Sequence, residues 1–228
     1  MNEQAQLAPR AHGAQPEAPR AFTDEITPLI ITLDEEANIE RTLSALGWAK
    51  RIVVVDSGST DATLAILARD ARITVHHNPF ETFARQCQFG LSLIDTEWVL
   101  SLDADYELSE ALRTEIARLR PEDDAAGYMA RFIYRIHGRS LRGALYPPRI
   151  VLYRRAVAAY RDIGHGHRVD VAGPVRLLDA PIYHDDRKPL SRWFASQQRY
   201  AQKEPDHLLP AGTSELALPD RIRLMIWP

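Results

Sequence analysis

Residues 97–107 read EWVLSLDADYE, and this stretch decides the fold that the sequence predicts. It begins with a run of apolar residues from Trp98 to Leu102 that lacks the spacing of an amphipathic helix. Such a run is typical of a strand that is buried on both faces of a parallel sheet. Asp103 and Asp105 follow directly. Because the carboxyl ends of parallel strands line the crevice where open α/β sheets bind ligands, the two carboxylates predict a site for a divalent cation and a phosphate.

Taken alone, an Asp-Ala-Asp sequence is more often the start of a turn, so the surrounding pattern has to decide between the two interpretations. The preceding chain alternates between patterns for strands at residues 29–33, 52–55 and 73–75 and for helices at residues 35–46, 62–69 and 83–94. This alternation predicts an α/β fold with a doubly wound, mainly parallel sheet. Asp34, Asp56 and Asp103 would all lie at carboxyl ends of strands, which favours a ligand site over three separate turns.

The pattern changes after residue 108. A helix is predicted at residues 109–119, and strand-like segments follow at residues 128–136, 149–154 and 175–178. They predict a smaller antiparallel extension of the sheet. A last helix is expected at residues 190–201, where aromatic residues at helical spacing predict a side that packs inward, namely Trp193, Phe194 and Tyr200.

The totals describe an ordinary soluble globular protein. The chain has 228 residues, 45% of them hydrophobic, and a formal net charge of −3. The absence of a basic excess argues against nucleic acid as a partner. Cys87 is the single cysteine, so no internal disulfide can form, which fits a reducing, cytoplasmic location.

The two ends of the chain have their own compositions. Residues 1–24 contain no apolar block, so they predict a disordered leader instead of a secretory signal. Residues 205–228 form a C-terminal tail that turns apolar from residue 217, with Arg221 and Arg223 among Leu, Ile, Met and Trp. This pattern is typical both of a helix in the membrane interface and of a terminal helix that packs on its domain. The first interpretation predicts peripheral contact with the cytoplasmic face of the inner membrane.

The motifs resemble those of family 2 inverting glycosyltransferases with the GT-A nucleotide-diphospho-sugar transferase fold, in particular lipopolysaccharide core β-glucosyltransferases of bacteria. The most specific pair is VVVDSGSTD followed by WVLSLDAD, and the other matching segments are IITLDEEANIERTLSAL, LYPPRIVLYRR and IYHDDRKPLSRWFASQQRYA. The resemblance implies one GT-A domain over residues 25–204, with a nucleotide-binding half at residues 25–108 and an acceptor half at residues 109–204.

The resemblance also implies a reaction and its participants. It implies transfer of a hexose, expected to be glucose, from a nucleotide-sugar donor, expected to carry UDP, to a lipid-linked glycan acceptor such as lipopolysaccharide core. The residues expected in the donor pocket are Thr32, Glu36, Asp56, Arg85, Gln86 and Asp103. The resemblance further implies Mg²⁺ or Mn²⁺ as cofactor, and the residues expected to hold it are Asp105, Asp103 and His184.

The chemistry independently requires these residue types. A nucleoside diphosphate leaves only if its new negative charge is neutralised, and a cation held by carboxylates does this as a Lewis acid. For His184 a loop histidine without a ligand is the alternative interpretation. Arg187, Lys188 and Arg192 are further candidates to meet the diphosphate, and Arg139 and Arg142 either meet an anionic acceptor or are simply solvated.

An inverting reaction also requires one general base for the acceptor hydroxyl. The family commonly has this carboxylate in a His-Glu-Arg-Val type segment, whereas this chain reads DIGHGHRV over residues 162–169. His167 stands at the Glu position, and its usual pKa suits a base. The other candidates are Asp162, Asp170 and His165, and for His165 a loop histidine without a catalytic role is an equal alternative.

Two other classes of function remain in competition. A phosphatase with an Asp nucleophile also uses a strand followed by Asp-x-Asp, but it usually places this motif on the first strand and wants Thr or Val where this chain has Glu107. A nucleotide- or glycan-binding module of the same fold that has lost catalysis is the second alternative, because His167 replaces the expected carboxylate.

Overall fold

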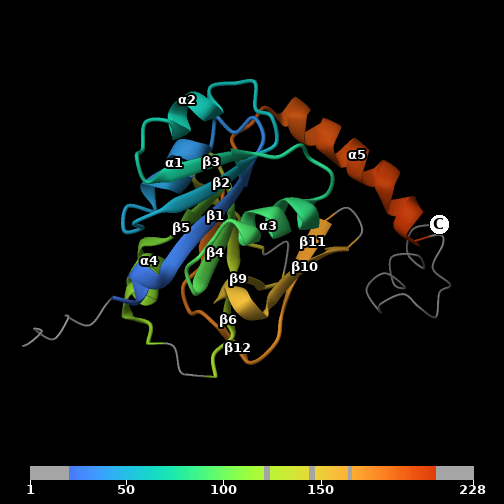
Figure 1. The fold of residues 1–228 in the computed structure, drawn as a ribbon. Helices are drawn as coiled ribbons and strands as arrows, with labels where there is room; N and C mark the ends of the chain where they lie inside the picture. The colour runs from blue at the N-terminus through green and yellow to red at the C-terminus, as the bar shows by residue number, and fades with distance from the viewer. Residues whose placement is uncertain (1–20, 121–123, 144–146, 164–165, 209–228) are drawn as a thin grey trace, which may run out of the picture.

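The centre of the molecule is a seven-stranded sheet (Figure 1). The computed structural model describes residues 21–120, 124–143, 147–163 and 166–208. All strands of the sheet run in one direction except β9, which is antiparallel to both of its neighbours. The predicted α/β fold with a mainly parallel sheet is therefore confirmed. The order across the sheet is β12 (Val175–Leu177), β6 (Gly127–Ala130), β9 (Arg149–Arg154), β4 (Trp98–Asp103), β1 (Ile26–Thr32), β2 (Ile52–Asp56) and β3 (Ile73–His77).

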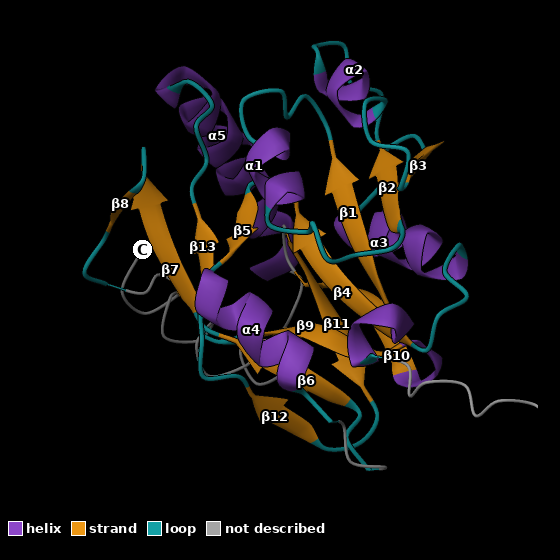
Figure 2. Cartoon of the chain, turned by 90° about the vertical axis from the view of Figure 1, so that its left-hand side faces the viewer, coloured by secondary structure: helices purple, strands orange, loops and turns teal. Residues whose placement is uncertain are grey.

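Helices cover both faces of this sheet (Figure 2). One face carries α1 (Ile39–Ser44) and α4 (Glu110–Arg118), and the short α2 (Thr63–Leu67) lies beyond α1 next to the end of β2. The other face carries α3 (Phe83–Ser92) and an antiparallel hairpin of β10 (Ala158–Ile163) and β11 (Gly166–Val171). The sheet is thus a buried middle layer.

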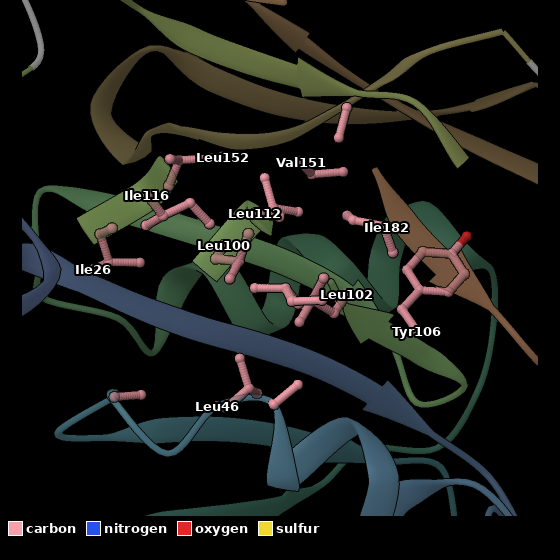
Figure 3. Close-up of a cluster of buried hydrophobic side chains, with 14 of the residues drawn as sticks. Ile26, Leu46, Leu100, Leu102, Tyr106, Leu112, Ile116, Val151, Leu152 and Ile182 are labelled. Carbon is pink, nitrogen blue, oxygen red and sulfur yellow. The ribbon is translucent and has the colours of Figure 1, made fainter. Parts of the chain in front are cut away.

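Burial on both faces explains the unbroken apolar runs of the central strands. Successive residues of a strand point to opposite faces, so every position of such a strand meets a core. In β4, Leu100 and Leu102 join the core beneath α4, where Leu112 and Ile116 meet them (Figure 3). Val99 joins the core beneath α3. The sequence pattern of residues 97–107 therefore follows directly from the layer arrangement.

The strands in the second half of the chain are distributed over more than one sheet, whereas the sequence predicts a single extension of the main sheet. The expected strand at residues 128–136 is two strands, since β6 belongs to the main sheet and β7 (Phe132–Ile136) to a separate four-stranded sheet. Buried and exposed positions keep alternating through Arg131, so the pattern gives no sign that the chain changes sheets. The other strands of the second sheet are β5 (Tyr106–Leu108), β13 (Ile182–His184) and β8 (Arg139–Ser140).

Both expected domain boundaries fall inside secondary structure. Phe22–Glu25 form a 3-10 helix that includes the last residues of the expected leader, and the Phe22 ring packs edge-on against Trp98 with 5.3 Å between ring centroids. At the other end, α5 (Leu190–Leu208) runs through the boundary expected between residues 204 and 205. Within the described ranges, no helix has the length and apolar character needed to span a membrane.

The last helix differs from the prediction in its surroundings. In Figure 1, α5 extends outward from the body of the molecule. Trp193 is 49% exposed and Phe194 is 59% exposed, so the prediction that these rings pack inward is wrong. Helical spacing identified a common side of the helix, but it could not show that no other element covers that side. The Tyr200 side chain and most of the predicted membrane-associated tail, residues 209–228, lie outside the described residues.

Candidate functional site

The carboxyl ends of three neighbouring strands bring the predicted polar residues to one edge of the sheet. Thr32 at the end of β1 is in register with Asp56 at the end of β2. On the other side of β1, Ile31 is in register with Asp103 at the end of β4. The expected placement of Asp56 and Asp103 at strand ends is therefore confirmed.

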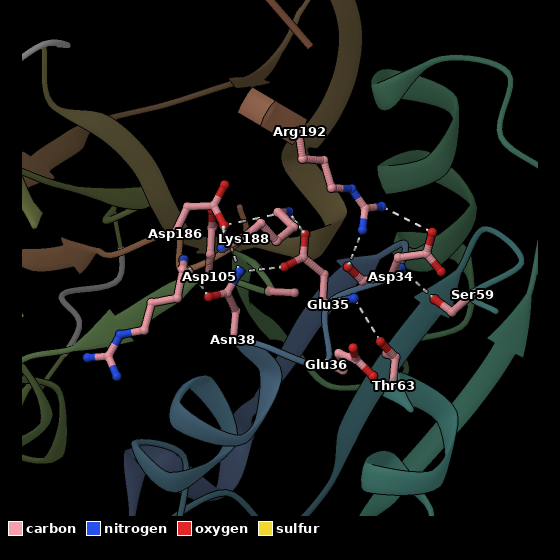
Figure 4. A network of polar contacts seen from close by, with 12 residues as sticks. Asp34, Glu35, Glu36, Asn38, Ser59, Thr63, Asp105, Asp186, Lys188 and Arg192 are labelled. Atoms are coloured by element: carbon pink, nitrogen blue, oxygen red, sulfur yellow. Dashed lines mark hydrogen bonds and ion pairs between the residues drawn. The ribbon is translucent and has the colours of Figure 1, made fainter. Parts of the chain in front are cut away.

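The loops that follow β1 and β2 are joined by reciprocal hydrogen bonds (Figure 4). The Asp34 amide donates to Ser59 Oγ at 2.9 Å, and the Thr60 amide donates back to Asp34 Oδ1 at 2.8 Å. The exposed Glu36 accepts from the Ala62 amide through Oε2 at 2.9 Å. Glu36, which was expected in the donor pocket, therefore uses a carboxylate oxygen to hold the two loops together.

Asp56 and Thr32 are both buried, but of their two side chains only that of Asp56 has hydrogen-bond partners among the described residues. The Asp56 carboxylate accepts from the backbone amides of Gly58 and Ser59 at 2.8 and 2.9 Å, so it shapes the loop after β2. The Thr32 hydroxyl has no hydrogen-bond partner among the described residues. Because a buried polar group without a partner is costly, this hydroxyl is a natural contact for a ligand.

Arg85 and Gln86 are adjacent in sequence but differ in environment. Gln86 is buried, and its Nε2 donates to Ser57 Oγ at 2.8 Å, which ties α3 to the loop after β2. Arg85 is an exposed residue that pairs with Glu81 one helical turn earlier. Of these two expected donor residues, Gln86 is therefore the one that the structure joins to the strand-end loops.

Asp105 and His184 form a hydrogen-bonded pair at this edge, and each shifts the pKa of the other. β13 carries His184 to Asp105, and His184 Nε2 lies 3.0 Å from Asp105 Oδ2. Burial alone would raise the pKa of Asp105, but the hydrogen bond and charge of His184 outweigh it and hold that pKa below its usual value. Burial would lower the pKa of His184, but Asp105 reverses this and raises it. The pair therefore favours a carboxylate beside an imidazolium.

A network of polar contacts joins the β1–α1 loop to the segment before α5, near Asp105 (Figure 4). Asn38 is fully buried, and its Nδ2 donates to Glu35 Oε2 at 2.8 Å and to Asp186 Oδ1 at 2.9 Å. Asn38 Oδ1 accepts from the Arg187 amide at 2.9 Å. Lys188 pairs with Glu35. Asn38 thus fixes the segment that follows His184.

Glu35 is the acidic residue that the sequence reasoning missed, because the adjacent Glu36 was assigned to the donor pocket instead. Burial is the main reason why the pKa of Glu35 rises to about 6, and the nearby Asp105 adds to the effect while Lys188 opposes it. The only sequence signal was its place beside Glu36 in the DEEAN stretch, which cannot show which of two adjacent carboxylates points inward.

The candidate bases lie on the β10–β11 hairpin, beside α3. His167 stacks on Phe83 with 5.7 Å between ring centroids, and it is in register with Asp162. Burial is the main reason that the pKa of His167 is lowered, although the charges of Asp103 and Asp162 oppose the shift. Asp162 Oδ1 accepts from the Ala84 amide at 3.3 Å. His165 lies outside the described residues.

The donor set at the strand ends suits the expected cation. Asp103 and Asp105 supply carboxylate oxygens, and His184 supplies an imidazole nitrogen, all of which are ligand types for Mg²⁺ or Mn²⁺. The lowered pKa of Asp105 keeps its carboxylate ionised. Across the described ranges, no three His, Cys, Asp or Glu side chains already converge in a metal-binding arrangement. The residue types therefore fit the ion, while the Asp105–His184 hydrogen bond holds two of the three together.

In the metal-free protein, the pKa values of His184 and His167 are predicted to lie on opposite sides of 6.5, the usual value for histidine. His184 is expected above this value, because Asp105 stabilises its charged form, and His167 below it, because burial disfavours charge. Side-chain ¹H–¹⁵N spectra recorded against pH in the presence of EDTA would measure both. In Asp105→Asn, the pKa of His184 should fall while that of His167 changes less. A His184 pKa unaffected by this substitution would contradict the ion pair.

The sequence and the fold are similar to those of known proteins in three comparisons. A model of the family described as "Glycosyl transferase family 2" matches residues 28–176. The chain is 27% identical over 224 residues to a Rickettsia bellii protein called "Uncharacterized glycosyltransferase", covering 90% of this chain and 74% of that protein. It is 34% identical over 142 residues to the Rhizobium meliloti "Lipopolysaccharide core biosynthesis glycosyltransferase LpsC", covering 60% of this chain and 50% of LpsC.

The fold is similar to that of S. aureus TarS, whose crystal structure was solved in complex with UDP-GlcNAc. The TM-score is 0.53 at 15% sequence identity, and the match covers 72% of this chain. The chain spans 59% of the TarS chain. The mixed, mainly parallel α/β architecture is therefore the GT-A architecture of these structures.

Proposed function

The chain belongs to glycosyl transferase family 2, and from this membership we propose that it transfers a hexose from a nucleotide-diphosphate sugar to a lipid-linked glycan, with inversion at the anomeric carbon. The observation that carries the proposal is that Asp103 ends β4 and is followed two residues later by Asp105, which is hydrogen-bonded to His184. A carboxylate-rich strand end in an open α/β sheet is where a nucleotide diphosphate and its cation are expected to bind.

The donor is proposed to be a UDP-sugar, with glucose as the hexose. TarS, which shares the fold, was solved with UDP-GlcNAc, and this supports a UDP donor without identifying the sugar. In this chain, Thr32 offers a buried hydroxyl without a partner, and Asp56 and Gln86 fix the loop beside it. These residues are proposed to line the nucleoside pocket.

The leaving diphosphate requires positive charge near Asp105. A bound Mg²⁺ or Mn²⁺, held by Asp103, Asp105 and His184, would neutralise the diphosphate as a Lewis acid. Lys188 lies in the same network, and its pKa is raised because Glu35, Asp186 and Asp105 outweigh the effect of burial. We propose that Lys188 remains charged and orients the donor phosphates.

His167 is proposed as the general base. Its lowered pKa keeps the imidazole neutral at pH 7, so that it can accept the proton of the acceptor hydroxyl. His167 stacks on Phe83 of α3, and the charge of Asp103 opposes the fall of its pKa, which supports a position near the proposed donor carboxylates. Asp162 already accepts a hydrogen bond from the start of α3, so it is the weaker candidate.

The acceptor is proposed to be lipid-linked, with lipopolysaccharide core as its closest precedent. This rests on the partial match to LpsC, which covers half of that protein. A lipid-linked acceptor would place the enzyme at the cytoplasmic face of the inner membrane. The alternative function is nucleotide or glycan binding without catalysis, which the His at the position of the usual carboxylate favours.

Calorimetric titration with UDP, GDP, CDP and dTDP, each with Mn²⁺ and again with EDTA, tests the proposal. We expect one nucleotide, UDP, to bind in a metal-dependent manner, and its hexose conjugate to be consumed when acceptor glycolipid is added. Metal-dependent binding without any transfer to glycolipid acceptors would support the binding module instead. If none of the four nucleotides bound, the proposed transferase function would be contradicted.

A further inference from the structure

A group of exposed side chains lies where α5 begins. Leu190 is 65% exposed, and Trp193 and Phe194 are about as accessible, although all three are large and apolar. The three positions have the spacing of one helical face. Every position from Leu190 to Gln198 is exposed except Ser196, so no other described element covers this part of α5.

The β7–β8 hairpin contacts the segment just before this helix. Its turn residue Gly138 donates a backbone hydrogen bond to Asp185 Oδ2 at 2.9 Å, and a Cβ placed on Gly138 would lie 3.8 Å from Arg187 Nη2. Asp185 and Arg187 both belong to the segment just before α5. Figure 2 shows the hairpin and α5 on the same side of the molecule. The hairpin adds a fourth exposed apolar side chain, Ile136, which is 58% exposed.

The charge of this region is opposite to that of the chain as a whole. The net charge is −3, yet residues 125–161 contain no Asp or Glu and eight arginines, two of which, Arg139 and Arg142, are exposed on the hairpin. Within the described part of the chain, neither of these two is paired with a carboxylate. Residues 190–203 of α5 likewise contain basic residues and no acidic one.

We propose that these side chains form a docking surface for an anionic phospholipid bilayer; the α5–hairpin surface consists of Leu190, Trp193, Phe194, Ile136, Arg139 and Arg142. Large apolar side chains flanked by basic residues are the composition of segments that lie in the membrane interface, where the apolar groups enter the headgroup region and the arginines meet lipid phosphates. The inference does not rest on the proposed function, because vesicle binding requires neither donor nor acceptor. It concerns a different part of the chain from residues 217–228.

A second copy of the chain is a poorer occupant of this surface. A two-fold interface apposes the same patch on both subunits, so the arginines of the two hairpins would be brought towards each other without carboxylates between them. A bilayer with anionic lipid supplies the complementary charge instead. Docking here would also hold the Asp185 segment, and therefore His184, close to the lipid surface.

Flotation of the full chain with vesicles tests the proposal. We expect binding to phosphatidylcholine vesicles that contain about one-third phosphatidylglycerol, little binding to pure phosphatidylcholine, and weaker binding at high salt. Trp193→Ser with Phe194→Ser, and separately Arg139→Glu with Arg142→Glu, should each weaken binding at least about tenfold. The matched control for the charge change is Arg69→Glu with Arg118→Glu, two exposed arginines, one in the turn after α2 and one at the end of α4, that should leave binding unchanged.

Fluorescence quenching locates the contact. In the Trp227→Phe protein three tryptophans remain: Trp193 is exposed, Trp98 is fully buried, and Trp48 is partly buried against the core. Brominated lipid should therefore quench Trp193 most strongly, and the further change Trp193→Phe should remove that part of the quenching. Vesicle binding equal to the parent in both surface variants would overturn the proposal and place any membrane contact elsewhere. A dimer in solution that Trp193→Ser with Phe194→Ser dissociates would also overturn it, in favour of a second copy.

Discussion

Asp105→Ala is expected to abolish metal-dependent donor binding, with a loss of affinity on the order of 10²–10³-fold. The substitution removes a carboxylate that is kept ionised by its hydrogen bond with His184. It also leaves a half-buried imidazole without its partner, so the remaining ligands lose both charge and orientation. Calorimetry with the nucleoside diphosphate that the parent binds, with Mn²⁺ and with EDTA, measures the effect directly.

The control for this experiment is Asp95→Ala. Asp95 is 86% exposed and forms a surface ion pair with Arg51, so its loss should change donor affinity very little. Thermal unfolding of both variants would show whether the Asp105 effect is one of binding or of folding. Metal-dependent affinity that survives in a folded Asp105→Ala protein would remove Asp105 from the metal site.

His167→Ala is expected to lower the turnover number by about 10²–10⁴-fold, the usual contribution of a general base, while donor affinity stays close to that of the parent. The parent's turnover should rise with pH through the pKa of His167, which lies below 6.5, because only the neutral imidazole can accept a proton. Above that pKa the rate should level off. The measurement is the pH profile of transfer, together with donor binding in the same variant.

Two further variants separate the candidate bases. His167→Glu restores the residue type common in the family, and we expect it to recover part of the transfer with the acid limb of the profile shifted to lower pH. Asp162→Asn keeps the shape of the side chain beside the start of α3 and should retain most activity. Parental turnover in His167→Ala, combined with inactivity of Asp162→Asn, would assign the base to Asp162.

The main sheet could be predicted from the sequence because its strands meet a core on both faces. Ile52 to Val55 are buried without exception, so the apolar run by itself indicates a central strand. The strand-end positions of Asp56 and Asp103 follow from the same runs. The placement of these residues therefore needed no knowledge of distant contacts.

The remaining parts of the site depend on contacts between segments that are far apart in the chain. Lys188 pairs with Glu35 across 153 positions, and Asn38 meets Asp186 across 148 positions. No local periodicity carries information about such pairs. The β10–β11 hairpin was missed for a related reason, since most positions of β10 are exposed and its pattern therefore lacks a buried face.

The late position of β13 in the chain has a consequence for biosynthesis. All seven strands of the main sheet lie before residue 178, whereas His184 and Lys188 follow it. A chain emerging from the ribosome can therefore complete its main sheet before it has the residues that we propose complete the donor site. The proposed donor site would then form only after a folded sheet is available for β13 and the segment that follows it to pack on.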